Sequence, residues 1–177
     1  MKLNLGCGPH YAEGWWNVDV IESDEHDIHP DQIIEAGLKL PFRDGEFERV
    51  YVGHLLEHVP WEQTPYLLAE LERVIEPGGR LGIVGPDVMR ALDRWKDGSE
   101  PFWLVEACLE DDKTFMADGS WDGARHQWNC YESRVSGLLT SCGFPNHKAL
   151  DMEHPEQFSD WPIVSFALWQ FGIEVQL

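Results

Sequence analysis

Basic residues are scarce in this chain of 177 residues. Lysine and arginine together number 13, against 32 aspartates and glutamates, and the formal net charge is −19. Such an acidic surface repels phosphate backbones and anionic lipid headgroups. The composition therefore argues against nucleic acid and membrane surfaces as partners.

Cysteines and long apolar runs are also few. The four cysteines contain no C-x-x-C pair, a pattern that favours reduced thiols over a disulfide framework or a zinc site. No apolar run approaches membrane-spanning length, and a first strand that begins at residue 2 leaves no room for a signal peptide. From the sequence we expect a cytoplasmic protein.

The most informative feature that is present is a glycine pair followed by an acid. A short apolar run ends in Gly6-Cys7-Gly8, and a second one, Trp16-Asn17-Val18, ends in Asp19. Glycines at a strand end let a bound molecule approach the backbone, and an acid at the end of the next parallel strand can accept hydrogen bonds from two ribose hydroxyls. The pair predicts a nucleoside cofactor that lies across the ends of both strands.

The connection between these two strands is short. Only nine residues, Cys7 to Trp15, separate them, whereas a parallel crossover usually takes about a dozen or more. A full helix does not fit, and at most one turn is possible around Tyr11-Ala12-Glu13. We therefore expect a shortened crossover that leaves one end of the cofactor open beside His10 and Tyr11.

The rest of the chain alternates strand and helix patterns, as in an α/β domain. Strands are expected at 3–6, 16–20, 33–36, 47–53, 80–85, 148–152 and 169–177, and helices at 64–75, 87–95, 102–109 and 131–142. Thr64 and Asp87 are candidate helix caps, and Pro77-Gly78-Gly79 is expected to end the first helix. The last strand alternates apolar and polar residues, which predicts one buried face.

Five segments, taken in order, resemble the motifs of class I S-adenosylmethionine-dependent methyltransferases. They are the glycine-rich Leu3–Gly8, the ribose-binding acid Asp19, the "LPF-x-DG" segment Leu40–Val50, the "H-x-LEH" stretch His54–Val59 and the "PGG" segment Glu72–Leu81. Tyr131 to Phe144 is similar to the family's late helix, which ends in "GF". The resemblance is dense from residue 2 to about 87 and partial after about 125.

The resemblance implies a Rossmann-like three-layer sandwich. Its sheet would be seven-stranded and mostly parallel, with an antiparallel C-terminal strand. It implies a single domain over 1–177, with 1–87 as the cofactor-binding half and 88–177 as the substrate-side helices, loop and last strands. The implied cofactor is S-adenosylmethionine, and the product is S-adenosylhomocysteine.

Cofactor contacts follow from the matched positions. The implied cofactor-binding residues are Asn4, Gly6, Cys7, Gly8, Asp19, Ala36, Gly37, Leu38 and His54. The glycines and His54 would lie at the methionine end, Asp19 at the ribose, and residues 36–38 beside the adenine. Asn4 departs from the family pattern, since an acid is usual there, and His10 takes the usual third glycine position. Asparagine can still accept a hydrogen bond but lacks the charge that would favour the cofactor's ammonium.

Methyl transfer from a sulfonium chiefly needs alignment, because the donor is already activated. A hydroxyl acceptor would also benefit from a general base. The candidate catalytic residues are His126, Asp87 and His58. Helix capping is the alternative role for Asp87 and a structural hydrogen bond for His58, while His126 could also be an ordinary surface residue. No Asn-Pro-Pro-Tyr type segment follows the fourth strand, which favours an oxygen, a carbon or an amine on a small molecule.

An acidic cluster between residues 24 and 31 contains the residue types of a metal site. Its members are Asp24, Glu25, His26, Asp27, His29 and Asp31. These residues are adjacent and are not spaced to converge on an ion, so we interpret them as a solvated loop and predict no metal site.

The sequence favours methyl transfer to a small-molecule or glycan-like acceptor. Two alternatives stay open. One is a peptide or protein methyltransferase, and the other is a catalytically inactive S-adenosylmethionine-binding module, which the residues at positions 4 and 10 would allow. The sequence does not distinguish a monomer from a homodimer.

Overall fold

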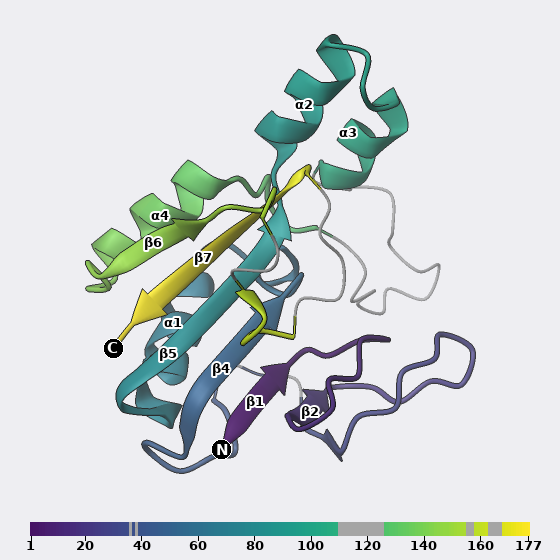
Figure 1. Cartoon of the computed structure of the whole chain (residues 1–177). Coiled ribbons are helices and arrows are strands. Elements are labelled where there is room, and N and C mark those ends of the chain that lie inside the picture. The colour runs from purple at the N-terminus through teal and green to yellow at the C-terminus, as the bar shows by residue number, and fades with distance from the viewer. Residues whose placement is uncertain (36, 38, 110–125, 155–157, 163–167) are drawn as a thin grey trace.

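The computed structural model describes residues 1–35, 37, 39–109, 126–154, 158–162 and 168–177 (Figure 1). A seven-stranded sheet in the order β3-β2-β1-β4-β5-β7-β6 forms its centre. The strands are β1 (Lys2–Leu5), β2 (Trp16–Asp19), β3 (Gln32–Ile33), β4 (Phe47–Gly53), β5 (Ile75–Pro86), β6 (His147–Leu150) and β7 (Gln170–Gln176). Strands β1 to β5 run parallel to one another, and β7 runs antiparallel to both β5 and β6. The predicted Rossmann-like sheet is confirmed.

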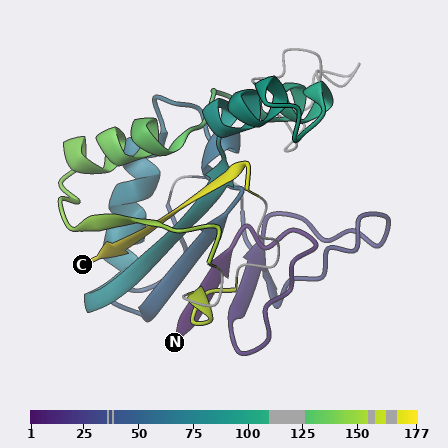
Figure 2. The ribbon, with the colours of Figure 1, turned by 45° about the horizontal axis from the view of Figure 1, so that its top comes forward.

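Helices lie on one face of the sheet and beyond one of its ends (Figures 1 and 2). They are α1 (Thr64–Val74), α2 (Val88–Lys96), α3 (Phe102–Cys108), α4 (Glu132–Ser141) and the short 3₁₀ helix η1 (Leu56–His58). Apolar residues of α1 and α4 share one core with β1, β4, β5 and β7. None of the helices that the structure describes is long and apolar enough to cross a membrane.

The opposite face of the sheet carries a thinner layer. Phe158 and Trp161, from the segment after β6, pack there on Tyr51 and Val84. Phe158 lies in a 3₁₀ turn, and the described residues next to it, 159–161, form turns and a bend. In the part of the chain that the structure describes, aromatic side chains therefore contribute much of this layer.

Strand β5 begins earlier than the sequence predicted. Ile75 pairs with Phe47, and the next paired residues are Arg80 and Arg49, so β5 carries extra residues across a bulge. Gly78 has a φ of +84°, which a glycine adopts without strain. The prediction that Pro77-Gly78-Gly79 ends the helix was wrong, because the helix stops at Val74 and the turn forms inside the strand.

Two smaller predictions also need correction. Thr64 is the first helical residue and not the cap, and its hydroxyl donates to the Pro60 carbonyl at 3.2 Å. Strand β7 is buried on both faces from Gln170 to Ile173. β7 lies between β5 and β6 in the sheet, so this end of the strand is buried on both faces and not on one.

The crossover between β1 and β2 contains no helix within residues 6–15, all of which are described. This confirms the shortened connection. The buried side chain of Asn17 holds this connecting loop through hydrogen bonds. Its Oδ1 accepts from the Ala12 amide at 2.8 Å and from Asn4 Nδ2 at 2.9 Å, and its Nδ2 donates to the Ala12 and Trp15 carbonyls at 3.0 Å each.

Asp31 completes this network from the edge of the sheet. Its Oδ2 accepts from the Asn17 backbone amide at 2.8 Å, and its Oδ1 accepts from the Tyr11 hydroxyl at 2.9 Å. The hydrogen bond from the Asn17 amide lowers the pKa of Asp31. The network therefore fixes a loop of turns that also carries Gly6 and Gly8.

We expect Asn17→Ala to lower the free energy of unfolding by about 3 kcal/mol, because it strands several buried polar groups at once. Chemical denaturation measures this change. The control is Tyr11→Phe, which removes an exposed hydrogen bond of the same network and should cost less than about 1 kcal/mol. Equal stabilities of the two variants would contradict the central role of Asn17.

Candidate functional site

The carboxyl ends of β1, β2, β4 and β5 meet at one edge of the sheet. The chain leaves β1 toward β2 on one side and later returns to β4 on the other, so the strand order reverses between β1 and β4. Ligands of open α/β sheets bind in the crevice at such a reversal. Two adjoining cavities open there, and both are lined by Gly6.

The glycine loop after β1 has the backbone that the sequence predicts. Gly6 has a φ of +68° and Gly8 a φ of +50°. The positive φ of Gly6 favours glycine, and an added Cβ would lie 3.0 Å from Leu55 Cδ1 and displace that side chain slightly. Between them, Cys7 is buried, and burial together with the Asp19 charge raises its pKa to about 11. Its thiol is therefore protonated and unreactive at neutral pH.

Asp19 holds this loop from the end of β2. Its Oδ2 accepts from the Gly8 amide at 2.8 Å, and its Oδ1 accepts from the Val20 amide at 2.7 Å. A carboxylate has about four lone-pair positions. Asp19 can therefore hold the loop and still accept hydrogen bonds from a bound ligand in the cavity that it lines.

The larger cavity has a volume of about 340 Å³. Its apolar lining comes from Leu5, Val20, Ile34, Leu40, Leu55, Val59, Pro60 and Leu67, and its polar lining includes Asp19, Glu35, His58 and Gln63. Gly37 also lines it. The predicted contacts Ala36 and Leu38 lie outside the described residues.

The smaller cavity, of about 60 Å³, lies between β1, β4, β5 and β7. Asn4, Cys7, His10, His54 and Gln170 are among the residues that line it. Asn4 is buried, and its amide donates to the His10 carbonyl at 3.0 Å as well as to Asn17. His10 lines this cavity, whereas the Tyr11 hydroxyl donates to Asp31.

His54 ends β4 in an unusual conformation. Its φ is +53°, a left-handed value that costs free energy in any residue other than glycine. Its Nδ1 lies 3.1 Å from Glu57 Oε1, and its Nε2 lies 2.6 Å from Gln170 Nε2. If the Gln170 amide donates to Nε2, then Nδ1 carries the proton and donates to Glu57. The ring is therefore fixed from both sides.

Glu57 is a fully buried carboxylate. Burial raises its pKa, but the hydrogen bond from His54 and the electrostatic attraction of His54 and His58 outweigh burial, and the net pKa is lowered. Its Oε1 faces His54, while its Oε2 has no hydrogen-bond partner among the described residues. The sequence named His54 and His58 but missed the acid between them. The only sequence feature that could have pointed to Glu57 is its position in the "LEH" stretch.

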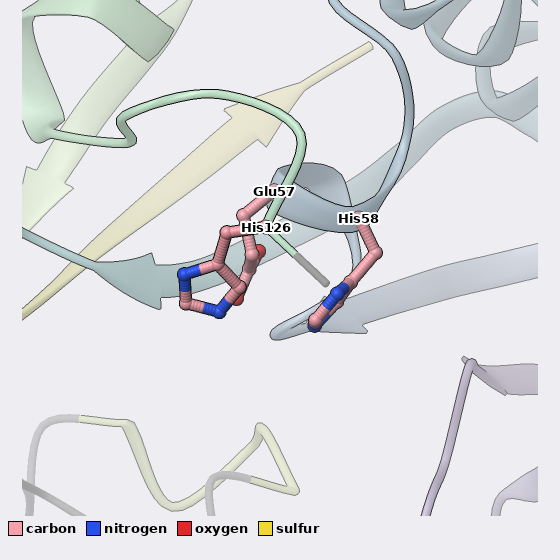
Figure 3. Close-up of side chains that lie close together, drawn as sticks. All are labelled: Glu57, His58 and His126. Carbon is pink, nitrogen blue, oxygen red and sulfur yellow. The ribbon is translucent and has the colours of Figure 1, made fainter. Parts of the chain in front are cut away.

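Two predicted catalytic residues, His58 and His126, come together beside Glu57 (Figure 3). Their ring centroids lie 5.0 Å apart, and the potential ligand atoms of all three side chains lie within 4.8 Å of one another. Burial is the main cause of a lowered pKa at His126. Its imidazole is therefore neutral at neutral pH, as a general base or a metal ligand must be.

The segment that carries His126 is tied to η1 by backbone and indole hydrogen bonds. The Gln127 amide donates to the Glu57 carbonyl at 2.6 Å, and Trp128 Nε1 donates to the Leu56 and Val59 carbonyls at 3.1 and 3.0 Å. Trp128 is buried by these contacts. Its indole therefore belongs to the core that supports η1 and is not available to stack on a substrate.

Asp87, the third predicted catalytic residue, connects two helices. Its Oδ1 accepts from the Met89 and Arg90 amides at the start of α2, and its Oδ2 accepts from the Glu132 amide at the start of α4. This confirms the helix cap expected at α2 and adds a second one. Both oxygens serve the backbone, so the structure gives Asp87 a capping role.

The acidic cluster between residues 24 and 31 lies on an exposed loop. His29 is 3.9 Å from Asp24 and 3.5 Å from Asp27 across side chains that are half or more exposed. Among the residues that the structure describes, the one group with metal-ligand spacing is Glu57, His58 and His126.

Comparisons with known proteins agree with this geometry. The family model described as "Methyltransferase domain" matches residues 3–83. No curated protein sequence matches the chain.

Solved structures share the fold over nearly the whole chain. A SAM-dependent methyltransferase from Archaeoglobus fulgidus superposes with a TM-score of 0.59 at 14% identity, covering 99% of this chain and 85% of its own. A SAM-dependent methyltransferase from Thermotoga maritima, described as a possible histamine N-methyltransferase, gives 0.58 at 15% identity, with 99% and 81% covered. The DhpI–SAH complex gives 0.53 at 13% identity, with 98% and 74% covered.

These structural likenesses establish the fold, and the family match covers the part of the chain that carries the glycine loop, Asp19 and the Glu57 region. Residues 3–83 thus match a methyltransferase domain, and the chain has the fold of solved SAM-dependent methyltransferases.

Proposed function

We propose that this chain is an S-adenosylmethionine-dependent methyltransferase that acts on a hydroxyl group of a small-molecule or glycan-like acceptor. The observation that carries the proposal is the continuity of the site. His58 lines the larger cavity together with Asp19, and its ring contacts that of His126 on the other side. A cofactor cavity thus leads directly to a pair of imidazoles, which are the side chains best suited to take a proton near neutral pH.

The residues around the two cavities suit S-adenosylmethionine. A volume of about 340 Å³ lies within the range of about 300–1,000 Å³ that is usual for small-molecule sites. We assign the ribose hydroxyls to Asp19 and the adenine to the apolar wall that includes Ile34 and Leu40, with Gly37 alongside. We assign the methionine end to Gly6, Gly8 and the smaller cavity with Asn4, Cys7 and His54. When bound, the cofactor supplies an electrophilic methyl group on a sulfonium.

His126 is our candidate for the group that receives the acceptor's proton. Its lowered pKa keeps the ring neutral, and the hydrogen bonds of Gln127 and Trp128 hold its segment against η1. His58 then orients the acceptor from the cavity side. We prefer these histidines to Asp87, because both oxygens of Asp87 already accept backbone hydrogen bonds.

The division of the chain follows from this assignment. We propose that residues 1–87 hold the cofactor and that residues 88–177 supply the acceptor side, beginning with the two helices that rise beyond the sheet (Figure 1). We also place the protein in the cytoplasm. All four of its cysteines are free thiols, which suits a reducing compartment.

Calorimetry and an acceptor panel test the proposed function. Binding of both S-adenosylmethionine and S-adenosylhomocysteine, with turnover on hydroxylated small molecules or oligosaccharides, is the expected result. Turnover on peptides alone would replace our acceptor class with a protein substrate. Cofactor binding without turnover on any acceptor would favour the inactive binding module.

We expect Asp19→Ala to weaken S-adenosylmethionine binding by about 100-fold, since it removes the charge-assisted hydrogen bonds to both ribose hydroxyls. Isothermal titration calorimetry measures the change. Asp24→Ala removes a fully exposed acid of the neighbouring loop and should bind the cofactor like the original protein. If both variants bind equally well, the ribose does not lie at Asp19.

We expect His126→Ala to lower kcat by about 10²- to 10⁴-fold, the usual contribution of a general base, without changing cofactor affinity. In the unmodified protein, kcat should rise with pH and level off, with a midpoint below the ordinary histidine value of about 6.5, because burial lowers the pKa of His126. His154→Ala, which alters an exposed histidine, is the matched control. Full turnover by His126→Ala would remove His126 from the mechanism.

A further inference from the structure

Glu57, His58 and His126 form a compact cluster of metal-ligand atoms (Figure 3). Glu57 and His58 are neighbours in η1, and His126 reaches them from a segment almost 70 residues later in the chain. We propose that these three side chains bind a first-row divalent transition ion, with Zn²⁺ as its representative. The sequence predicted no metal site, because the three residues are brought together only by the fold.

The buried carboxylate of Glu57 is the strongest reason for a cation. The side chain has no exposed surface, and its Oε2 has no hydrogen-bond partner among the described residues. A buried oxygen of an ionised group that lacks a partner is costly, and native proteins seldom leave one in that state. A cation beside Oε2 would satisfy it.

The donor set decides which cation fits. Two imidazole nitrogens and one carboxylate oxygen suit zinc and its first-row neighbours, whereas magnesium and calcium prefer oxygen ligands alone. Zinc ligands stand about 2.0–2.2 Å from the ion. The three donor atoms already lie within 4.8 Å of one another, so rotation of the His58 and His126 rings toward Glu57 completes the site.

The surroundings hold these ligands in position. His54 Nδ1 lies 3.1 Å from Glu57 Oε1, which leaves Oε2 for the ion. The other ring nitrogen of His54, Nε2, lies against the Gln170 side chain. The backbone next to His126 is fixed by the hydrogen bond from Gln127 to the Glu57 carbonyl. Metal sites commonly depend on such supporting hydrogen bonds to orient their ligands.

Three protein ligands leave an open position on a tetrahedral ion, as in catalytic zinc sites. His58 also lines the cofactor cavity, so this position faces the place where we put the acceptor. This step rests on the proposed function. A hydroxyl at the open position loses its proton more readily because the ion lowers its pKa. The proton passes to water, the oxygen forms a bond to the methyl carbon, and the carbon–sulfur bond breaks with its electron pair left on sulfur.

In the metal-loaded protein, the ion thus takes over the proton-releasing role that we assign to His126 in the metal-free chain. The preferred acceptors are hydroxylated compounds that offer an oxygen to the ion. The exposed cluster near His29 is a separate acidic region that serves as an internal comparison.

The test uses protein that has been treated with a chelator and desalted. It is titrated with Zn²⁺ by calorimetry and with Co²⁺ by visible absorption. Moderate salt and excess Mg²⁺ suppress weak binding to the acidic loops. We expect one ion per chain. His58→Ala and His126→Ala should each weaken binding by more than about tenfold, the least that loss of even a supporting partner costs a metal site. Glu57→Gln should do the same if it folds, and the two histidine variants suffice if it does not.

His29→Ala is the matched control and should bind the ion like the original protein. The absence of a one-to-one site would overturn the proposal, and so would equal affinities in the original protein and the His58→Ala and His126→Ala variants. The metal titration needs no cofactor or acceptor. A protein that binds Zn²⁺ at these residues but not S-adenosylmethionine would refute the proposed function alone, and the reverse result would refute the metal site alone.

Discussion

The functional edge of this molecule depends on the burial of one charge. Glu57 has no exposed surface, so its carboxylate must be stabilised by its neighbours. His54, at the end of β4, faces one oxygen and is itself held by Gln170 of β7. The backbone of Glu57 accepts from Gln127, which fixes the segment that carries His126. Three separate parts of the chain are therefore positioned by a single side chain and its peptide group.

The cofactor end is built on a different and more local principle. Gly6, Gly8 and Asp19 lie within one strand-loop-strand unit, where Asp19 holds the loop through the Gly8 amide. The connection is too short for a helix, and a buried asparagine, Asn17, satisfies the polar groups that a helix would otherwise satisfy within itself. The Asn4 side-chain amide donates to Asn17 in this network, so it is already engaged in holding the loop.

This difference explains how much the sequence could reveal. The strand bounds near residues 2–19 and 47–53, and the glycine-and-acid pair, follow from local patterns and were predicted. The start of β5 was missed, because the bulge at Gly78 depends on pairing with β4. The meeting of Glu57 with His126 was also beyond a local pattern. It depends on a contact between segments almost 70 residues apart, and on a strand, β7, whose Gln170 looked like an outward-facing polar residue.

A further consequence concerns how the two ends can vary. The cofactor end rests on backbone geometry at Gly6 and on a carboxylate that must serve loop and ligand together, so few substitutions are compatible with it. The acceptor end rests on a segment attached to η1 by a few hydrogen bonds from Gln127 and Trp128. Changes around residues 126–131 can therefore reposition an imidazole without disturbing the strand ends to which we assign the cofactor. On our proposal, acceptor choice and cofactor binding are physically separable properties that meet at His58, which lines the larger cavity and contacts His126.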